Sequence, residues 1–408
     1  MADPLNPAQP VDDLAASVRL LTTKYLSQWL GTPASHPVFP RLYTPAQQAK
    51  REVEFDSAIP GGILPDEHVR RLSPEERAVL RSRAKSAVIR LLASTADPLV
   101  RPFFDECDGV AEEFVILAEK FDPSLSRPDI HQALRNQWVF NSIQFFLSLP
   151  VSLSPSSFAY SLLYPYTDNR LDALGQTAGA KESFLHWLSL RLQGLPAVAP
   201  DPHARKVSWL LRMIAEEYPR SRFPLVHESL VSIHRAQENS LLLHGVPGSG
   251  DESCLLARTI EKGGTSVLAD GFLVGGALDW ATMDQLFGYG VLLQLVDDLQ
   301  DLREDTAASH STPFVRAGEG PVLEDLTKRL LRFASAVASS IKGPDPGRDQ
   351  SMRSLVERSC ILQIQLSVAK DDGRFSSSFR QALEAGAPVR LSYMKEMQQR
   401  VTTGSRDA

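Results

Sequence analysis

Four carboxylates share one face of a predicted helix near residue 300. They are Asp297, Asp301, Glu304 and Asp305. At about 100° per residue they fall on a stripe of similar width, directly after the apolar residues 291–296. Like charges four residues apart destabilise an isolated helix, so we expect a hard divalent cation such as Mg²⁺, which prefers oxygen ligands, to compensate for them. The alternative is an acidic helix end that faces water.

Asp168 and Asp172 form a second carboxylate pair with helical spacing, and Asn169 between them offers a further oxygen ligand. Alone, this pattern is more often a helix cap or a turn. With the first cluster, it predicts two helices that face each other across a pocket and hold Mg²⁺ against substrate phosphate oxygens. An apolar wall below two acidic rims suits a diphosphate with a hydrocarbon tail, whose C–O bond would ionise to an allylic cation. The candidate catalytic carboxylates are Asp168, Asp172, Asp297 and Asp301.

A third acidic run contains Asp105, Glu106 and Asp108 and follows two phenylalanines. Its aromatic lead is short, and Glu112 and Glu113 continue the charge outward. We therefore expect a solvated helix face here rather than the metal motif.

Cations near a pair of glycines are candidates for binding the diphosphate. Gly263 and Gly264 lie between two apolar helical runs, and we expect them to break the helix and expose backbone N–H groups. The candidate diphosphate ligands nearby are Arg235, Arg258 and Lys262. Surface cations at a helix end are the alternative. The glycine-rich residues 245–250 lack the Lys-Ser/Thr ending of a phosphate loop and are interpreted as a connector.

Aromatic side chains at helical spacing are candidates for the hydrocarbon pocket, because their π faces stabilise cations. Packing in the ordinary core is the alternative. The aromatic candidates are Trp138, Phe140, Phe145, Phe146, Phe158, Tyr160 and Tyr164, and Gln294 is the polar candidate.

Helical periodicity extends along the chain, and sustained alternation of polar and apolar residues is absent, so we predict an all-α fold. Ser73, Pro74 and Glu76 provide the signature of a helix start. The predicted helices cover 11–30, 73–96, 103–120, 128–149, 154–175, 178–193, 203–218, 223–243, 251–262, 265–278, 281–305, 321–342, 350–370 and 375–401. We expect a Pro-rich arm with a helix over residues 1–63 and a single catalytic domain over 64–408.

Composition narrows the class of protein. The 408 residues are 43% hydrophobic and 23% charged with a net charge of -6, which is typical of a globular protein and gives no basic surface for nucleic acid. Cys107, Cys254 and Cys360 are scattered, which favours a reducing cytoplasm and argues against a zinc site. Without a signal peptide or an apolar run of about 18 residues, we expect a cytoplasmic protein with at most peripheral membrane contact. The sequence is compatible with a homodimer.

Several segments occur in the order and at the spacings typical of class I trans-isoprenoid synthases. They are Asp168…Asp172, Gln237, Lys262-Gly-Gly-Thr265 and Gln294…Asp297-Asp298-x-x-Asp301. Over residues 158–315 the chain resembles this superfamily, and most closely the large-terpene synthases of the tetraprenyl-β-curcumene synthase type (class IB terpene synthases). The closer resemblance rests on the Asp-Asn-x-x-Asp motif, on Lys262–Asp270 and on Asp297-x-x-x-Asp301-x-x-Glu304-Asp305.

This resemblance implies a helical bundle around a central active-site cavity and a cluster of up to three Mg²⁺ ions. It also implies a terpene synthase, which removes diphosphate from a linear prenyl diphosphate, of C20 or longer, before cyclisation or elimination. By position, the implied metal ligands are Asp168, Asn169, Asp172, Asp297, Asp301, Glu304 and Asp305.

Two departures from the chain-elongating members of the superfamily favour a single substrate. Those enzymes open the first motif with two carboxylates and place an Arg pair shortly after it. Here Asn169 occupies the second place, and residues 173–179 contain no Arg. The alternatives are a trans-prenyltransferase, including squalene- or phytoene-like head-to-head coupling, and a helical carrier that binds prenyl tails without turnover.

Overall fold

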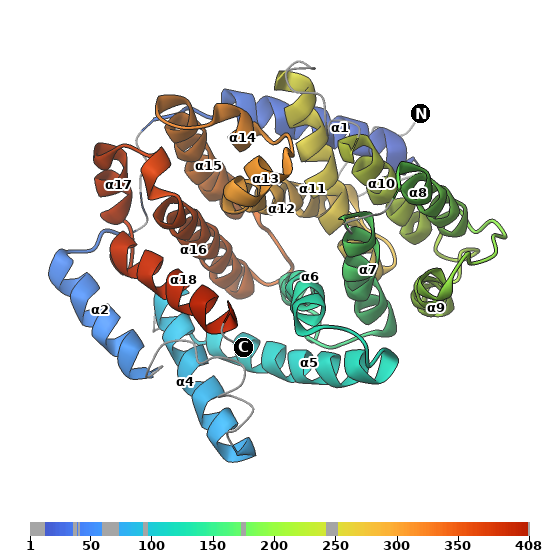
Figure 1. The fold of residues 1–408 in the computed structure, drawn as a ribbon, viewed down its shortest axis with the longest axis horizontal. Coiled ribbons are helices and arrows are strands. Elements are labelled where there is room, and N and C mark those ends of the chain that lie inside the picture. Colours follow the sequence, from blue (N-terminus) through green and yellow to red (C-terminus); the bar gives the residue numbers. More distant parts are fainter. Residues whose placement is uncertain are drawn as a thin grey trace.

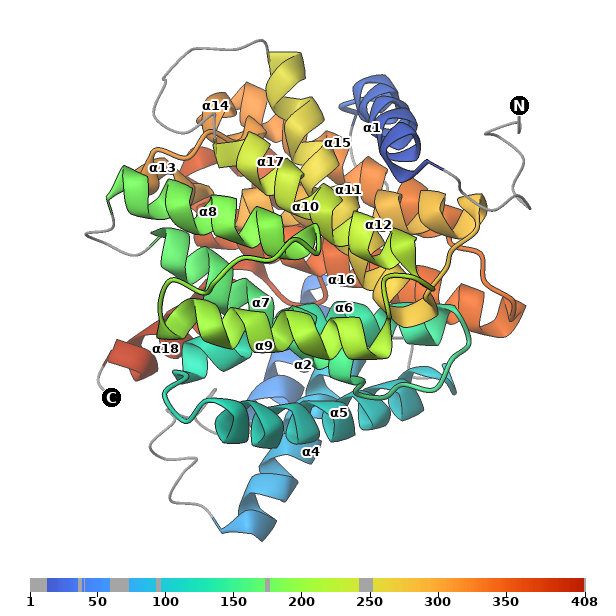
Figure 2. The ribbon, with the colours of Figure 1, turned by 90° about the vertical axis from the view of Figure 1, so that its right-hand side faces the viewer.

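The structure is a computed structural model that describes residues 13–35, 39, 41–58, 73–92, 97–172, 177–241 and 252–406. Within these ranges the regular elements are helices, as Figures 1 and 2 show, which confirms the predicted all-α fold. In chain order the helices are α1 (Leu14–Gly31), α2 (Pro45–Ala58), α4 (Pro74–Leu92), α5 (Val100–Phe121), α6 (Arg127–Phe146), α7 (Pro155–Asp172), α8 (Ala178–Leu192), α9 (Pro202–Glu217), α10 (Pro224–Leu241), α11 (Glu252–Gly275), α12 (Trp280–Gln300), α13 (Leu302–Ala308), α14 (Pro313–Ala317), α15 (Pro321–Ser340), α16 (Pro346–Lys370), the 3₁₀ turn η1 (Asp372–Arg374), α17 (Ser377–Glu384) and α18 (Leu391–Arg406). The predicted connector at 245–250 lies outside the described residues.

The glycine pair lies inside one continuous helix, α11, so the predicted break at Gly263 and Gly264 is wrong. Both glycines are buried where α11 packs against α12. A Cβ on Gly263 would lie 2.7 Å from the carbonyl oxygen of Gly290, and one on Gly264 would overlap the ring of Phe287. Glycine is therefore needed for close approach of two backbones, at some cost in helix propensity.

The first helix covers the outer side of this helix pair. The ring of Tyr25 on α1 stacks on Phe287 with centroids 5.8 Å apart, and its hydroxyl donates a hydrogen bond of 2.8 Å to the carbonyl oxygen of Asp284. Trp29, one turn further, meets the ring of Phe333 edge-on. Buried aromatic packing thus attaches α1 to α12 and α15.

Helix α2 lies within residues 1–63, in a stretch where we predicted no helix. It lies beside α18 (Figure 1), and the buried carboxylate of Glu52 pairs with the half-exposed guanidinium of Arg390, just before α18. The amide of Gln48 donates bonds of 2.9 Å to the carbonyl oxygens of Glu384 and Ala387. Because these partners lie more than 330 residues away in the chain, the local sequence does not reveal this helix.

Two predicted helices are divided in the structure. The helix predicted over 281–305 bends at Asp301, which separates α12 from α13 with φ −93° and ψ 13°. The N–H of Asp301 still bonds to the carbonyl of Asp297 at 2.8 Å, so helical hydrogen bonding persists across the bend. The helix predicted over 375–401 becomes α17 and α18, because Gly386 and Pro388 interrupt it. No helix within the described residues is long and apolar enough to cross a membrane.

Candidate active site

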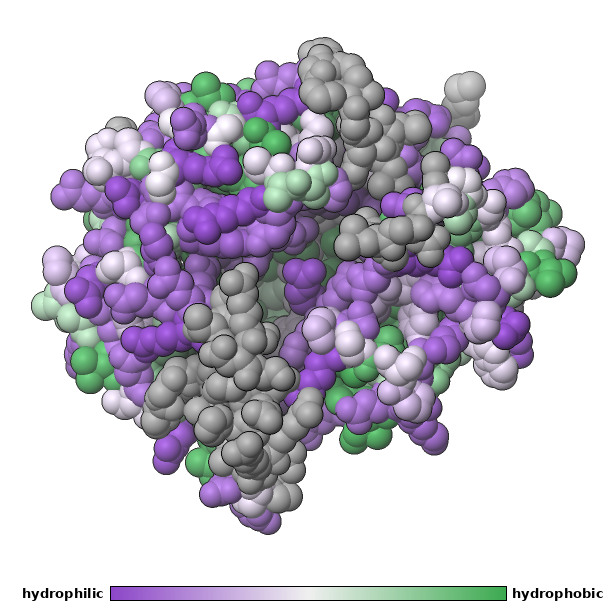
Figure 3. Space-filling view, in the orientation of Figure 1, coloured by the Kyte–Doolittle hydropathy of each residue, from purple (hydrophilic) through white to green (hydrophobic). Residues whose placement is uncertain are grey.

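A cavity of about 730 Å³ lies among α6, α7, α8, α10, α11, α12 and α16. Much of its wall is apolar, with Leu163, Leu188, Leu230, Val267, Leu293 and Leu355 among its lining residues. Figure 3 shows the molecule hollowed near its centre, with apolar atoms at depth and polar atoms around them. The volume is within the range of about 300–1,000 Å³ that is usual for small-molecule sites.

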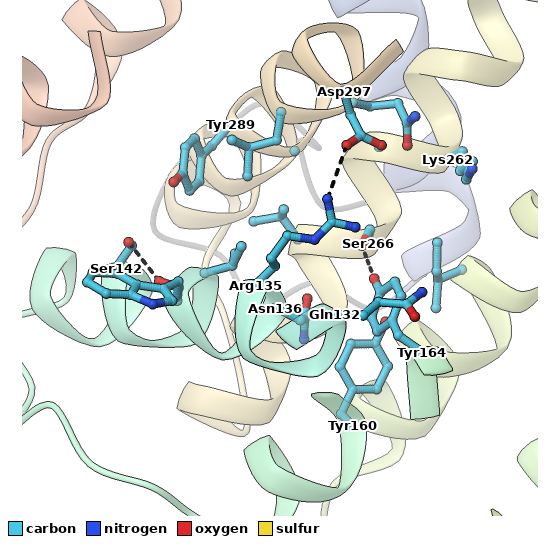
Figure 4. Close-up of a pocket in the computed structure, with 18 of the residues that line it drawn as sticks. Gln132, Arg135, Asn136, Ser142, Tyr160, Tyr164, Lys262, Ser266, Tyr289 and Asp297 are labelled. Atoms are coloured by element: carbon cyan, nitrogen blue, oxygen red, sulfur yellow. Dashed lines mark hydrogen bonds and ion pairs between the residues drawn. The ribbon is translucent and has the colours of Figure 1, made fainter. Parts of the chain in front are cut away.

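Polar contacts set the register of α6, α7 and α11 along one side of the cavity. The amide of Asn136 on α6 donates to Ser161 on α7 and to Asp270 on α11, each at 3.3 Å. The hydroxyls of Tyr164 and Ser266 hydrogen-bond to each other at 2.5 Å (Figure 4). Ser161 of α7 is level with Asp270 of α11, and Tyr164 of α7 is level with Ser266 of α11. The two helices therefore run in opposite directions.

This register places one carboxylate from each predicted acidic cluster on the cavity wall. Asp168 lies one turn after Tyr164, and Lys262 lies one turn before Ser266, so they are at a similar level. Asp168, Lys262 and Asp297 all line the cavity, and they come from three different helices. We call the end of the cavity marked by Asp168, Arg135, Lys262 and Asp297 the polar end.

Arg135 on α6 is a cation of the polar end that the sequence analysis missed. Its guanidinium points toward Asp297 in Figure 4, with Nη1 4.0 Å from Oδ1. Arg135, Gln132, Asn136 and Val139 line the cavity at the spacing of one helix stripe. Polar residues on the inward stripe of a largely buried helix were the pattern that could have identified them.

Negative charge accumulates behind Asp297. Burial, reinforced by the charges of Asp297, Asp305 and Glu304, raises the pKa of Asp301 to about 6. Burial also raises the pKa of Asp298 to about 7, although Gln294 donates a 2.7 Å bond to its carboxylate. The pKa of Asp305 is raised by burial too, and His310 at 3.2 Å opposes this. A divalent cation at this end would relieve the repulsion.

Of the seven predicted metal ligands, Asp168 and Asp297 are the two whose described side chains line the cavity. Asp301 and Asp305 lie behind Asp297 and do not line it, and the other three are placed as follows. Glu304 is exposed and forms an ion pair of 3.0 Å with Lys370; burial alone would raise its pKa, but the bonds from Lys370 prevail and lower it. The exposed Asn169 instead donates a 2.7 Å bond to Asp129 of α6. Asp172 ends α7, and its side chain lies outside the described residues.

Two predicted diphosphate ligands also lie away from the cavity. Helix α10 presents Leu230, Ile233, His234 and Gln237 to it, and Arg235, about 100° further around the helix, is exposed. The guanidinium of Arg258 donates a 3.0 Å bond to the carbonyl oxygen of Asn239. Of the three cations that we predicted, Lys262 is the one that lines the cavity.

The predicted pocket residues separate into lining and core. Tyr164 and Gln294 line the cavity, as do Trp138 and Tyr160. Phe145 instead packs on Phe103, and Phe158 packs on Phe114, with ring centroids 4.7 Å and 5.1 Å apart. These two are core residues because neighbouring aromatic rings enclose them. Phe140 and Phe146 are likewise buried without lining the cavity.

The third acidic run lies on the surface, as expected. Asp105 and Asp108 on α5 form ion pairs of 2.5 Å and 2.6 Å with Lys85 on α4. Neither carboxylate lines the cavity.

Comparisons with known proteins do not assign the chain to a family. No protein-family model and no curated protein matches it. Among solved structures, a geranylgeranyl pyrophosphate synthetase from the archaeon Geoglobus acetivorans is similar at 14% identity with a TM-score of 0.34, over 72% of this chain and 98% of that chain. A likeness at this level assigns no function. The cavity and its residues therefore carry the functional conclusion.

Proposed function

We propose that this protein is a Mg²⁺-dependent class I terpene synthase that ionises one linear prenyl diphosphate and directs the carbocation to cyclisation or elimination. The observation that supports the proposal is that Asp168 on α7 and Asp297 on α12 both line one largely apolar cavity. A diphosphate head fits the polar end, and a hydrocarbon tail fits the apolar wall.

The carboxylates of the polar end fit Mg²⁺ in its usual mode. Among the described residues, no three His, Cys, Asp or Glu side chains are grouped closely enough to hold a metal on their own. Mg²⁺ rarely occupies such a cage, because it takes one or two carboxylates and completes its shell with water and substrate phosphates. Within the part of the chain that the structure describes, Asp168 and Asp297 are the two carboxylates that line the cavity, and the crowded charge of Asp301 and Asp305 favours a cation nearby. When bound, Mg²⁺ would withdraw electron density from the diphosphate and make it a better leaving group.

The chain's own residues would bind the head group and shield the cation. Lys262 and Arg135 would pair with diphosphate oxygens, the guanidinium through two parallel bonds. The aromatic rings of Trp138, Tyr160 and Tyr289 line the wall and offer π faces to a carbocation. The surrounding leucines exclude water, which would otherwise capture the cation.

The number of cations supports a single diphosphate substrate. Among the described residues that line the cavity, Arg135 and Lys262 carry the positive charge. Condensation of two prenyl diphosphates would place a second head group in the cavity, and it would need further cations. A cavity of about 730 Å³ is large enough for a tail of C20 or longer.

The test is incubation of the protein with Mg²⁺ and geranyl, farnesyl, geranylgeranyl or longer prenyl diphosphates. Diphosphate release and extracted hydrocarbons are measured, with and without isopentenyl diphosphate. We expect release and a hydrocarbon from one allylic substrate alone. A longer prenyl diphosphate that forms only with isopentenyl diphosphate would instead identify a prenyltransferase, and coupling of two allylic molecules would identify a head-to-head synthase.

A carrier that binds prenyl tails without turnover predicts a different result. Folded protein would then release no diphosphate from any substrate. Binding would also persist in Asp168→Ala and Asp297→Ala variants, because the apolar wall alone would hold the tail.

A further inference from the structure

The last turn of α7, which carries Asp168, receives limited support from its own helix. Pro165 lies inside α7 and has no N–H to donate to the carbonyl of Ser161. The helix ends at Asp172, and the last four carbonyl groups of a helix have no partner within it. The direction of the Asp168 side chain therefore depends on the groups that contact this turn from neighbouring helices.

Tyr166 and Arg170 lie on the side of α7 opposite Asp168. Each is about 160° from Asp168 around the helix axis. Asp168 lines the cavity, whereas Tyr166 and Arg170 do not. Tyr166 is buried, and the side chain of Arg170 is only 18% exposed. Arg170 thus belongs to the acidic motif in sequence but faces away from the polar end.

Helix α9 packs beside α7 (Figure 2) and begins against this opposite side. Nη2 of Arg170 lies 2.6 Å from Oδ2 of Asp201, the N-cap residue of α9. Oδ1 of the same carboxylate accepts a 2.8 Å bond from the N–H of Ala204, so α9 itself fixes the carboxylate that Arg170 meets. Burial alone would raise the pKa of Asp201, but the bonds from Ala204 and Arg170 prevail and lower it, which keeps the pair charged.

Two further contacts hold the same side of α7. Nε2–H of His203, in the first turn of α9, donates a 2.6 Å bond to the carbonyl oxygen of Tyr166. The guanidinium carbon of Arg170 lies 4.6 Å from the centroid of the buried ring of Phe184 on α8, a cation–π contact. The planar guanidinium can make the ion pair and the ring contact together, which a lysine ammonium does less well.

A shared carboxylate adds a connection between α7 and α9. The hydroxyl of Tyr166 donates to the buried carboxylate of Asp122, and Lys206 of α9 pairs with the same oxygen. All the contacts from α9 come from residues 201–206, the beginning of that helix. The start of α9 therefore holds the last turn of α7 at one place, directly behind Asp168.

We propose that Arg170 and Asp201 are positioning residues that keep Asp168 directed into the polar end, where it would bind Mg²⁺. This inference rests on the proposed function and adds to it the support of the first metal-binding carboxylate. Without the ion pair, the last turn of α7 could rotate or fray and carry Asp168 away from the cavity. Groups that orient a metal ligand without touching the metal typically change metal affinity by about 10- to 100-fold.

The test compares Arg170→Gln and Asp201→Ser with a matched control, Arg390→Gln. Both site variants remove the ion pair, and serine can still cap α9. Arg390→Gln breaks the arginine–carboxylate pair with Glu52, which lies outside the cavity. The first measurement needs no turnover. It is the rise in melting temperature that Mg²⁺ with inorganic diphosphate produces in each protein, because a ligand of the folded state stabilises it in proportion to its affinity and concentration. The second is the Mg²⁺ concentration at which diphosphate release from a prenyl diphosphate is half-maximal.

We expect both site variants to need about tenfold more Mg²⁺ than the wild type in both measurements. Arg390→Gln should lower the melting temperature but keep the wild-type Mg²⁺ requirement. Arg170→Lys, which keeps the charge, should recover part of the loss. The double variant Arg170→Gln/Asp201→Ser should need no more Mg²⁺ than the worse single variant, since both substitutions remove the same contact.

A wild-type Mg²⁺ requirement in folded Asp201→Ser and Arg170→Lys or Arg170→Gln proteins would overturn the inference, because the ion pair would then stabilise the fold alone. The proposed function fails in a different way. In that case the wild-type protein itself would release no diphosphate and would gain no stability from Mg²⁺ with inorganic diphosphate.

Discussion

The guanidinium of Arg135 faces the carboxylate of Asp297 at the polar end of the cavity, with Nη1 4.0 Å from Oδ1. The two side chains come from α6 and α12, whose positions in the chain are far apart. Arg135 is 68% exposed, so the pair contributes little to stability and both groups remain accessible to a ligand. In the proposed reaction Asp297 would turn to the metal and Arg135 to the diphosphate.

Replacement of Arg135 by glutamine should therefore weaken substrate binding without unfolding the protein. Loss of a charge-assisted bond of about 1.5–3 kcal/mol corresponds to a rise in KM of about 10- to 100-fold. The melting temperature should change little. Arg205→Gln is the control, since Arg205 is an exposed arginine of α9 that does not line the cavity. Steady-state kinetics in which both variants match the wild type would remove Arg135 from the diphosphate site.

The contact between α11 and α12 should fail when a methyl group enters it. A Cβ on Gly290 would overlap the carbonyl oxygen of Gly263 and lie 3.0 Å from Cβ of Val267. Because backbone cannot move aside as a flexible side chain does, Gly290→Ala should destabilise the fold by about 1–3 kcal/mol. Gly109→Ala on α5 meets nothing within 4 Å and should stabilise by up to about 1 kcal/mol. Urea unfolding measures both, and equal stabilities would contradict the packing described.

Asp270 should make stability depend on pH. It is fully buried, and burial raises its pKa well above the usual value, while the bond from Asn136 opposes the shift. In the unfolded chain the carboxyl loses its proton near pH 4. As the pH rises above 4, Asp270 ionises in the unfolded chain but stays protonated in the folded protein. Its contribution to the free energy of unfolding is therefore complete below pH 4 and decreases progressively above it.

Asp270→Asn keeps an acceptor for Asn136 and removes the titration. Its unfolding free energy relative to that of the wild type should rise between pH 4 and pH 7. Parallel pH profiles of the two proteins in denaturant titrations would show that Asp270 is ionised in the fold.

The sequence reveals the carboxylates of the polar end better than their surroundings. Asp168 and Asp297 are predictable because apolar helical periodicity leads into each of them. The role of Gly263 is not predictable from the sequence, because glycine is typical both of a helix break and of a close contact between helices. Only the position of the partner helix distinguishes the two. Arg135 and His234 were not predicted to line the cavity for a related reason. Which side of a helix faces the cavity depends on the neighbouring helices.

Similar reasoning explains the residues that the prediction placed wrongly. Phe145 and Phe158 have the spacing of a pocket wall, but packing against Phe103 and Phe114 places them in the core. Glu304 continues the acidic stripe on an ideal helix; in the structure Lys370, which lies 66 residues further along the chain, holds it outside the cavity.

The most direct test of the central claim is Mg²⁺-dependent diphosphate release from a prenyl diphosphate by the wild-type protein and by Asp168→Asn and Asp297→Asn. Each variant keeps side-chain size and removes a charge at the polar end. Asp105→Asn, in the third acidic run outside the cavity, is the control. We predict Mg²⁺-dependent release by the wild type and the control, and a loss of at least about 100-fold in both site variants, as expected when several kcal/mol of metal-assisted stabilisation is removed. Release that survives both substitutions, or that needs no Mg²⁺, would contradict the account.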